Sequence, residues 1–471
     1  MTEFPKRFDH TTVEPEIYQR WLDLSLFTPK VPTDRPVFSI SIPPPNITGK
    51  LTMGHVLNNT IQDLIIRYKR LCGFETLWLP GMDHAGIATQ VKIEEKLRKE
   101  GKSKEKIGKE GFLKLAWQWK EEFAEIIRSQ LKRLGCSLDW SRERFTLDEG
   151  LSRAVRLVFV KLYEKGLIYR GRYMVNWCPR CRTALANEQV VREEEEGKLY
   201  YISYPLDGGG EVVVATTRPE TMLGDTAVAV NPDDDRYSAL VGRTAILPIL
   251  NRKLPIIADP YVDPEFGTGA VKITPAHDPA DFKIGKAHKL EEVEVIDEEG
   301  RMTEAAGPYH GLDRYECRKR LLADLKAKGF LREIKPYQIP IGRCERCQTV
   351  IEPRLSLQWF VKMRPLIEHA RKALDRGEIR IFPSRWINLF RHWIENIEDW
   401  CISRQLWWGH PIPVFYCQDC GETIVAMEDP TTCRCGSKRL VQDPDVLDTW
   451  FSSWLWPFST LGWPEETEDL K

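Results

Sequence analysis

The sequence predicts an α/β protein in which a doubly wound parallel sheet is interrupted by an inserted mixed β/α domain. Two observations support this fold class. A strand, a Gly-containing loop, a helix and a second strand follow one another between residues 37 and 79, and this is the building unit of such sheets. Two Cys-x-x-Cys pairs flank a long segment rich in strand-like runs. Because both pairs would bind one metal, the chain should leave the first domain and return to it.

These features divide the chain into four expected parts. They are an N-terminal helical extension over 1–36, the first half of the sheet domain over 37–177, the insertion over 178–347 with its core at about 185–340, and a return to the sheet domain over 348–471. In the extension, Ile17, Trp21 and Leu24 form the expected apolar side of a helix. The stretch "REEEEGK" at the start of the insertion is typical of a solvated turn.

Composition limits the partners that the protein can have. The 471 residues include 68 Lys+Arg and 69 Asp+Glu, for a formal net charge of −1. A polyanionic partner would therefore have to meet a local basic patch, because the chain as a whole supplies no attractive field. The N-terminal residues lack the apolar core of a signal peptide, and no apolar run approaches the length of a membrane span. We expect a cytoplasmic, monomeric protein without a membrane segment.

The stretch "SIPPPNITGKLTMGH" at 41–55 joins the first strand to the first helix. Three prolines end the strand, because proline cannot donate to a sheet ladder. The following helix is predicted over 56–68, where Leu57, Ile61, Leu64, Ile65 and Tyr68 are spaced to face a core. A helix N-terminus after a glycine-containing turn can bind a phosphate. A proline-rich surface loop with an incidental His is the plainer alternative.

A second polar motif follows the second strand, which is expected over 76–79. "LPGMDHAGIATQ" places Asp83 and His84 at the carboxyl edge of the sheet, where open α/β sheets bind ligands. A carboxylate there can bind an ammonium group, and a His beside a phosphate can stabilise developing charge.

Eight of the 12 cysteines occur in pairs and predict two structural zinc sites. Each pair, which we call a knuckle, supplies two thiolates. Two knuckles complete a tetrahedral zinc shell and leave no open position for a catalytic water. Since histidines are scarce near the pairs, the first two pairs are expected to share one zinc ion. The expected ligand sets are Cys178, Cys181, Cys344 and Cys347 for one site and Cys417, Cys420, Cys433 and Cys435 for the other.

Together with five further stretches, these motifs resemble the class I aminoacyl-tRNA synthetases, in the subgroup specific for valine, isoleucine and leucine. The further stretches, in chain order, are "WCPRCRTALANEQV", "ATTRPETMLGDTAVAV", "GTGAVKITPAHDPADF", "DWCISRQLWWGHPIP" and "DVLDTWFSSWLWPFSTLGWP". The resemblance covers nearly the whole chain. It implies a Rossmann-type catalytic domain with an inserted editing domain.

The resemblance assigns roles in amino-acid activation. "LTMGH" is similar to the family's HIGH signature, with Gly54 next to adenine and His55 on the ATP phosphates, while Thr52 replaces the first His and cannot carry its charge. The positions implied for valine are Pro43, Pro44, Asn46, Asp83 and Trp450, with Asn46 also at the ATP site and Asp83 on the α-ammonium group. "PPPN" favours valine, and an isoleucine- or leucine-specific member is the alternative.

The resemblance also assigns an editing pocket to the insertion. A pocket shaped for valine rejects threonine poorly, and this pair of amino acids is the established example of such weak discrimination, with a factor of about 10². The residues implied for hydrolysing the mischarged ester are Arg218, Phe266, Lys272, Thr274, Asp278 and Asp281. Asp281 would bind the threonine hydroxyl, Asp278 the ammonium group, and Arg218 and Lys272 the tRNA 3′ end. A capping role for one of the two acids is the structural alternative.

The implied function is ATP- and Mg²⁺-dependent activation of valine, its transfer to tRNA(Val), and hydrolysis of Thr-tRNA(Val). The family's Lys-Met-Ser-Lys-Ser loop is absent from this sequence. The stretch "GKSKEK" at 101–106 does not replace it, because that stretch is typical of a solvated helix. We therefore expect an N-terminal portion that lacks the half with this loop. An editing-only deacylase and a non-catalytic zinc protein that binds tRNA are the other hypotheses.

Overall fold

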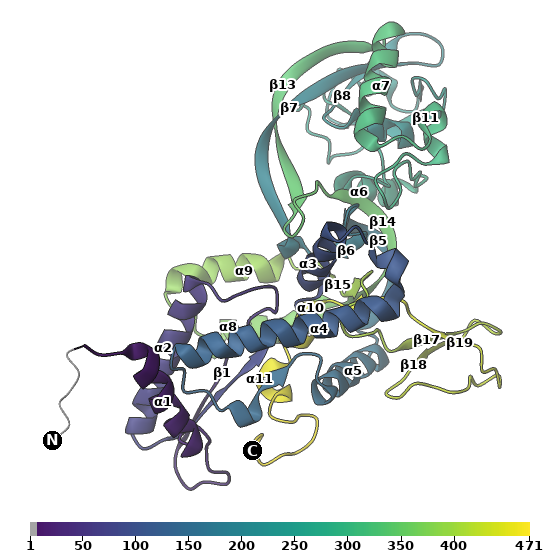
Figure 1. Ribbon diagram of the computed structural model, residues 1–471. Helices are drawn as coiled ribbons and strands as arrows, with labels where there is room; N and C mark the ends of the chain where they lie inside the picture. Colours follow the sequence, from purple (N-terminus) through teal and green to yellow (C-terminus); the bar gives the residue numbers. More distant parts are fainter. Residues whose placement is uncertain (1–6) are drawn as a thin grey trace, which may run out of the picture. The chain divides into compact units, whose positions relative to one another are not determined.

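A computed structural model describes residues 7–471, so the first six residues of the predicted N-terminal extension lie outside the described range. The described residues form two compact units, residues 7–168 with 402–471 and residues 169–401 (Figure 1). The second unit contains the predicted insertion and extends beyond it at both ends.

The first unit is built on a parallel βαβ motif, as predicted. β1 (Val37–Ser41) and β2 (Glu75–Leu79) pair in parallel from Val37 opposite Glu75 to Ser41 opposite Leu79. α2 (Met53–Leu71) connects them. β3 (Gly81–Met82) continues from β2 and pairs in parallel with β4 (Arg144–Phe145). Among residues 7–471, the sheet of β1 thus has two strands.

The predicted apolar side of α2 does not face a core within the described chain. Leu57, Leu64 and Tyr68 are 65%, 68% and 62% exposed, and Ile61 and Ile65 are also exposed. The helix instead buries Asn59 and Ile66. The expected apolar side of the first helix, α1 (His10–Asp23), is likewise wrong in part, because Tyr18 is buried while Ile17 and Leu24 are exposed.

Helices surround the βαβ motif of the first unit. They are α3 (Gly86–Lys99), α4 (Lys104–Arg133), which is kinked at Gly108, α5 (Glu149–Glu164), α10 (Thr449–Ser453) and α11 (Trp456–Ser459). Their core includes Trp78, Phe112 and Trp408. A small ribbon consists of β17 (Val414–Cys417), β18 (Thr423–Val425) and β19 (Leu440–Gln442), and β16 (Ser403–Arg404) pairs with β20 (Val446–Leu447).

The second unit begins with a four-stranded sheet that we call the stem. Its strands, in spatial order, are β15 (Trp400–Cys401), β14 (Glu352–Val361), β5 (Ile168–Cys178) and β6 (Thr183–Leu185). From it rises a long antiparallel ribbon of β7 (Val190–Pro205) and β13 (Leu331–Cys344). "REEEEGK" lies within β7, so the predicted turn is wrong: the ladder with β13 satisfies its backbone while the charged side chains remain accessible.

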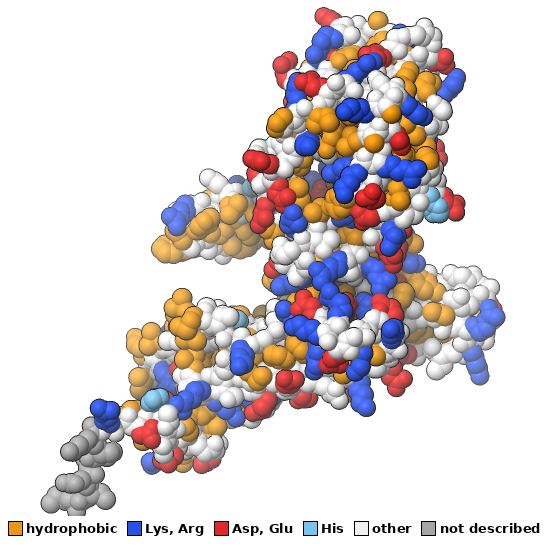
Figure 2. Space-filling model, turned by 45° about the horizontal axis from the view of Figure 1, so that its top comes forward, with side chains coloured by type: hydrophobic (Ala, Val, Ile, Leu, Met, Phe, Trp, Pro, Cys, Tyr) orange, Lys and Arg blue, Asp and Glu red, His pale blue; other side chains and the backbone are white. Residues whose placement is uncertain are grey.

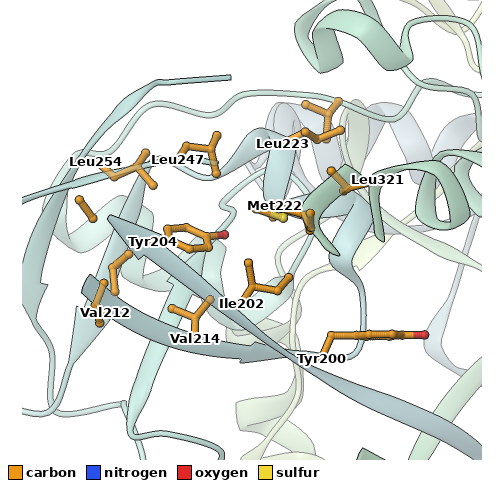
Figure 3. Packing of buried hydrophobic residues seen from close by; sticks show 14 of the residues in the cluster. Tyr200, Ile202, Tyr204, Val212, Val214, Met222, Leu223, Leu247, Leu254 and Leu321 are labelled. Atoms are coloured by element: carbon orange, nitrogen blue, oxygen red, sulfur yellow. The ribbon is translucent and has the colours of Figure 1, made fainter. Parts of the chain in front are cut away.

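The insertion core follows the ribbon. β8 (Glu211–Thr216) joins β7, and a second sheet has the order β10 (Thr244–Ile246), β11 (Lys253–Ala258), β9 (Ala227–Val230) and β12 (Ala270–Ile273). The helical segments are η3 (Pro219–Gly224), α6 (Pro279–His288), η5 (Glu304–Tyr309) and α7 (Arg314–Ala327). In Figure 3, side chains of β7 and β8 pack with Met222 and Leu321 into a core of its own. Between β14 and β15 the chain forms α8 (Met363–Asp375) and α9 (Ile387–Glu395).

The described surface shows mixed charge. On the face in Figure 2, Lys and Arg side chains are interspersed with Asp and Glu. Across residues 7–471, every helix is too short or too polar to cross a bilayer.

Candidate active site and metal centres

The opening loop lies directly beside Asp83. Asp83 N–H donates to the Pro45 carbonyl at 3.0 Å, and Ile47 N–H donates to the Asp83 carbonyl at 3.2 Å. Asn46 and Asp83 thereby form a parallel bridge beyond the ends of β1 and β2. Two predicted site residues that are distant in sequence therefore meet at the carboxyl edge of the sheet.

Asp83 is a buried carboxylate whose nearest basic group, His84 Nδ1 at 3.4 Å, is uncharged. Its oxygens accept hydrogen bonds from Ala85 N–H at 2.7 Å and from the Ser453 hydroxyl at 2.9 Å. Burial raises the pKa of Asp83 to about 6 despite these two donors. The adjacent His84 is neutral, because burial lowers its pKa to about 3. Among residues 7–471, no Lys or Arg side chain pairs with this carboxylate.

The N-terminus of α2 presents His55 in a defined state. Thr52 N–H donates to His55 Nδ1 at 3.1 Å, and the Thr52 hydroxyl lies 2.9 Å from the same nitrogen. A backbone N–H can only donate a hydrogen bond, so Nδ1 is the acceptor. In the neutral ring the proton is then on Nε2. Thr52, the departure from the family signature, thus orients the His and leaves it an Nε2–H donor.

Two glycines differ in what the fold requires of them. A Cβ at Gly54 would meet only Thr52 Oγ1 at 3.7 Å, an ordinary contact, so the described protein does not require glycine there. Gly86 has φ +32°, and a Cβ there would lie 2.4 Å from Thr449 Oγ1. Gly86 is therefore needed for packing, whereas open space adjoins Gly54.

The remaining residues predicted for valine are less enclosed. Pro43 is exposed and Pro44 is half-buried. Trp450 is 61% exposed and lies in α10, the helix whose Ser453 binds Asp83. Ser453 is a site residue that the sequence reasoning missed, although it lies in the quoted stretch around Trp450.

A second polar cluster lies in the insertion core and brings three predicted residues together. Lys272 Nζ lies 2.5 Å from Thr274 Oγ1, and Thr274 N–H donates to Asp281 at 2.8 Å. The centre of the cluster is Asp225, which accepts from the Thr274 hydroxyl at 2.5 Å and from the Tyr204 phenol at 2.7 Å. Burial raises the pKa of Asp225 in spite of these donors and Lys272. Asp225 was missed, although "GDTAVAV" contained it.

The two predicted acids differ in environment. Asp278 is the N-cap of α6, where its side chain accepts from the amides of Ala280 at 2.8 Å and Asp281 at 3.1 Å. The alternative that one of the two acids caps a helix is therefore confirmed for Asp278. Asp281 is 7% exposed, and burial followed by the charge of Asp278 raises its pKa to about 7.

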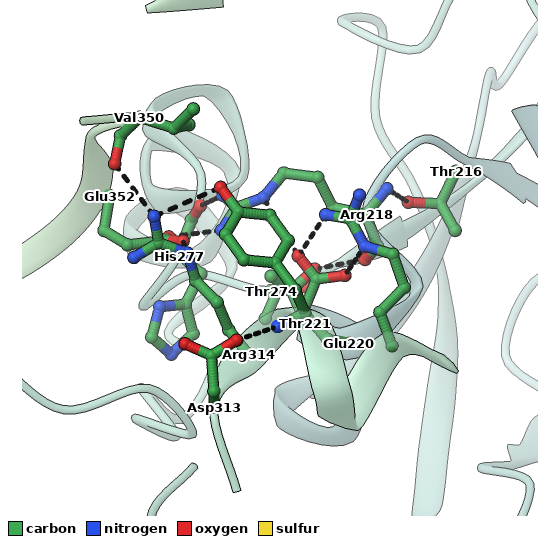
Figure 4. A network of polar contacts seen from close by, with 12 residues as sticks. Thr216, Arg218, Glu220, Thr221, Thr274, His277, Asp313, Arg314, Val350 and Glu352 are labelled. Atoms are coloured by element: carbon green, nitrogen blue, oxygen red, sulfur yellow. Dashed lines mark hydrogen bonds and ion pairs between the residues drawn. The ribbon is translucent and has the colours of Figure 1, made fainter. Parts of the chain in front are cut away.

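Arg218 and Phe266 contact the cluster differently. Arg218 Nη1 donates to the His277 carbonyl at 3.1 Å, which places it beside the 274–281 turn. Its guanidinium also pairs with Glu352 and Glu220 (Figure 4). Phe266 is 40% exposed, and its ring packs edge-on against Tyr337 at 6.0 Å.

The cysteines form the two predicted groups. In each group the four Sγ atoms lie within 4.8 Å of one another, and the members are Cys178, Cys181, Cys344 and Cys347, and Cys417, Cys420, Cys433 and Cys435. Cys178 and Cys347 have Sγ atoms 3.4 Å apart, Cys420 and Cys433 3.6 Å, and Cys417 and Cys435 3.7 Å. Tetrahedral thiolates at about 2.3 Å from zinc would be roughly 3.8 Å apart, so both groups fit the ion. The predicted convergence of two distant knuckles is confirmed.

Comparison with known proteins shows similar relatives over the length of the chain. The chain is 58% identical to a valine–tRNA ligase of Thermotoga maritima over 474 residues, covering 100% of this chain and 55% of the relative. It is 58% identical to a valine–tRNA ligase of Carboxydothermus hydrogenoformans over 469 residues, covering 99% and 53%. The chain thus spans about half the length of these curated relatives.

A solved structure, the LeuRS–tRNA–LeuAMS ternary complex of Agrobacterium radiobacter K84, is similar over 96% of this chain and 60% of that chain, with 20% identity and a TM-score of 0.48. The family model described as tRNA synthetases class I (I, L, M and V) matches residues 16–471. With a match over nearly its whole length, the chain belongs to the class I tRNA synthetases of this group.

Proposed function

We propose that this chain carries the valine-activation and editing centres of a valine–tRNA ligase. The relatives supply the substrate assignment, because they bear that name at 55 to 58% identity. The proposal includes tRNA(Val) as partner and a monomeric, cytoplasmic protein. The observation that carries it is Asp83, a buried carboxylate that pairs with no Lys or Arg within residues 7–471 and whose neighbour His84 is uncharged. A buried charge of this kind is stabilised by a ligand cation, and the α-ammonium group of an amino acid supplies one.

Activation would proceed at the adjoining helix terminus. The valine carboxylate attacks the α-phosphorus of ATP, a P–O bond forms, and the bond to pyrophosphate breaks. Mg²⁺ would enter with the nucleotide and neutralise phosphate charge. Here His55 can donate through Nε2, because Thr52 occupies Nδ1. The N-terminus of α2 adds unpaired N–H groups and a favourable dipole for the same phosphates. The acyl group then passes to the tRNA terminal ribose, and AMP leaves.

Editing is proposed for the cluster around Asp281. Water attacks the ester carbonyl of Thr-tRNA, the bond to the ribose oxygen breaks, and threonine leaves. Asp281 can accept a hydrogen bond from the threonine hydroxyl, which the corresponding methyl of valine cannot donate. Asp278 supplies negative charge for the ammonium group. Tyr204 and Thr274 donate to Asp225, which keeps this region of the pocket in one arrangement.

The two cysteine groups are proposed to hold structural zinc. Four thiolates complete each shell, so neither ion would take part in the reaction. In the second unit, zinc would join the end of β5 to the end of β13.

Valine binding to the 471-residue chain tests the activation centre. Asp83→Asn keeps the shape of the side chain and removes its charge, so valine affinity should fall about 30-fold or more, as loss of one partner of a buried charge pair would predict. Asp429→Asn is the matched control, because Asp429 is 69% exposed in its ion pair with Arg156. Calorimetric titration with valine measures both. Equal affinity of Asp83→Asn and the parent protein would remove Asp83 from the site.

A deacylase that edits without activating is the second candidate function. The observation in its favour is that the whole Asp281 cluster and its hydrophobic core lie within the unit of residues 169–401. Hydrolysis of Thr-tRNA by a chain that does not bind valine would favour this candidate.

A further inference from the structure

Five charged side chains of alternating sign form a chain within the second unit, in the order Arg314, Glu352, Arg218, Glu220, Arg318. Figure 4 labels the first four of them. Glu352 pairs with Arg314 Nε at 3.2 Å and accepts a short hydrogen bond from Arg218. Glu220 lies 3.5 Å from Arg218 Nε and receives two hydrogen bonds of 2.7 Å from Arg318. The central guanidinium, Arg218, is therefore held between two carboxylates.

The network joins three segments of the fold. Glu352 is the first residue of β14 in the stem, Arg218 is the N-cap of η3, and Arg314 and Arg318 lie one turn apart on α7. Arg314 also donates to the Val350 carbonyl at 2.9 Å, next to the same strand. Glu352 is thus the acid through which the stem contacts the insertion core in this network.

The charged groups of this network are buried, so each charge needs a partner of opposite sign. Glu352, Glu220 and Arg314 are 2%, 1% and 4% exposed. Although burial alone would lower it, the pKa of Arg218 is raised, because Glu352 and Glu220 stabilise its charge. Replacing a buried pair by apolar residues can be neutral, whereas removing one partner leaves an uncompensated charge that moves or attracts water. Loss of the Glu352 charge would leave Arg218 and Arg314 without the carboxylate that they share.

Arg218 also contacts the backbone next to Asp278. Its Nη1 donates to the His277 carbonyl at 3.1 Å, immediately before Asp278. His277 is itself fixed, since its Nε2 accepts from Val295 N–H at 2.8 Å and its own backbone N–H donates to the Thr274 carbonyl at 3.0 Å. Arg218 is therefore one of three contacts that hold the turn over 274–281, which ends in the first residues of α6.

We propose that Glu352 is a positioning residue for hydrolysis of mischarged tRNA, acting through Arg218 on the turn that carries Asp278 and Asp281. This inference rests on the proposed editing function. It changes the role expected of Arg218, whose ion pairs point to support of the pocket. A side chain that binds the tRNA end would mainly raise KM when removed, whereas one that positions the acids would mainly lower kcat.

The test compares Glu352→Gln, Arg218→Gln and the double variant in the 471-residue chain, with Thr-tRNA(Val) as substrate. Glu352→Gln should lower kcat about 10-fold to 100-fold, the cost of a misplaced reacting group, with KM within about twofold. The double variant should be no slower than the slower single variant, because both act through one contact. Glu333→Gln is the matched control: Glu333 is 53% exposed and pairs with Lys335. It should leave kcat unchanged.

A readout that needs no activity accompanies the kinetics. Amide hydrogen exchange of peptides covering 274–282 should be at least about tenfold faster in Glu352→Gln, while peptides of α4 are unchanged. If Glu352→Gln does not fold, Glu352→Asp keeps the charge, shortens the side chain, and is measured instead. Unchanged exchange in this turn, additive kinetic effects, or an effect on KM alone would each overturn the proposal. An inactive parent protein with faster exchange in the variant would refute editing but support the positioning contact.

Discussion

Asp281 combines burial with a proposed role that depends on its charge, and this combination predicts a pH dependence. Its pKa of about 7 means that the carboxylate form increases as pH rises from 6 to 8. Hydrolysis of Thr-tRNA, corrected for the spontaneous reaction, should therefore rise by up to about tenfold across this range. Asp281→Asn should be slower and should lose that rise. A parallel rise in Asp281→Asn would show that another group titrates.

The same residue has a calculable effect on stability. Its folded-state pKa lies above the unfolded value of about 3.9. The folded state therefore binds more protons between about pH 4 and 7, and Asp281 makes the free energy of unfolding fall as pH rises through this window. Asp281→Asn should remove that decrease, so at pH 8 the variant should be more stable than the parent protein. Denaturant titrations of both proteins at pH 4 and at pH 8 can check this.

At the residue scale, sequence patterns located groups whose chemistry is local. Asp83 and Asn46 were predictable because strand ends of one sheet meet at one edge. Glu352 was not, since its role arises from Arg218 and Arg314, which are remote in sequence. Asp225 lay in a quoted stretch, yet no spacing indicates that Tyr204 donates to it.

At the scale of elements, the helix α2 shows where periodicity fails. The pattern correctly predicted a helix, but it could not show whether another segment covers the apolar side. Within residues 7–471 that side is exposed, and the buried contacts come from Asn59 and Ile66. The turn predicted at 192–198 failed for a related reason, because charge on both sides of a two-stranded ribbon resembles the composition of a loop.

This exposed side of α2 gives a stability prediction. Leu64→Gln should change the free energy of unfolding by less than about 0.5 kcal/mol, because Leu64 is 68% exposed. Ile66→Ala on the same helix should cost about 2–5 kcal/mol, because Ile66 is fully buried. Chemical denaturation of the two variants measures the difference. A large loss for Leu64→Gln would mean that the apolar side is covered in solution.

The zinc knuckles predict metal content and its consequence. Purified protein should contain two zinc ions per chain. Cys344→Ser should remove one of them and Cys435→Ser the other, because each group needs four thiolates. Cys136→Ser is the matched control, since Cys136 is buried outside both groups. Metal analysis checks all three, and one zinc ion or none in the parent protein would contradict the two-site account.

At the scale of the molecule, the order of the segments was more predictable than the sheet. The excursion between the knuckles follows from tetrahedral metal geometry, and the structure confirms it. The two units have separate hydrophobic cores, so each can be described from its own residues. The number of strands in the parallel sheet was not predictable, because a strand pattern does not indicate how many other strands pair with it.

We propose that this chain discriminates threonine from valine on tRNA(Val). The most direct measurement is the rate at which the 471-residue protein deacylates Thr-tRNA(Val) and Val-tRNA(Val) under identical conditions. A buried polar group left unpaired costs about 1–3 kcal/mol, so Thr-tRNA should be hydrolysed roughly 10-fold to 100-fold faster. Equal rates for the two esters, or no hydrolysis of either by folded protein, would contradict the account.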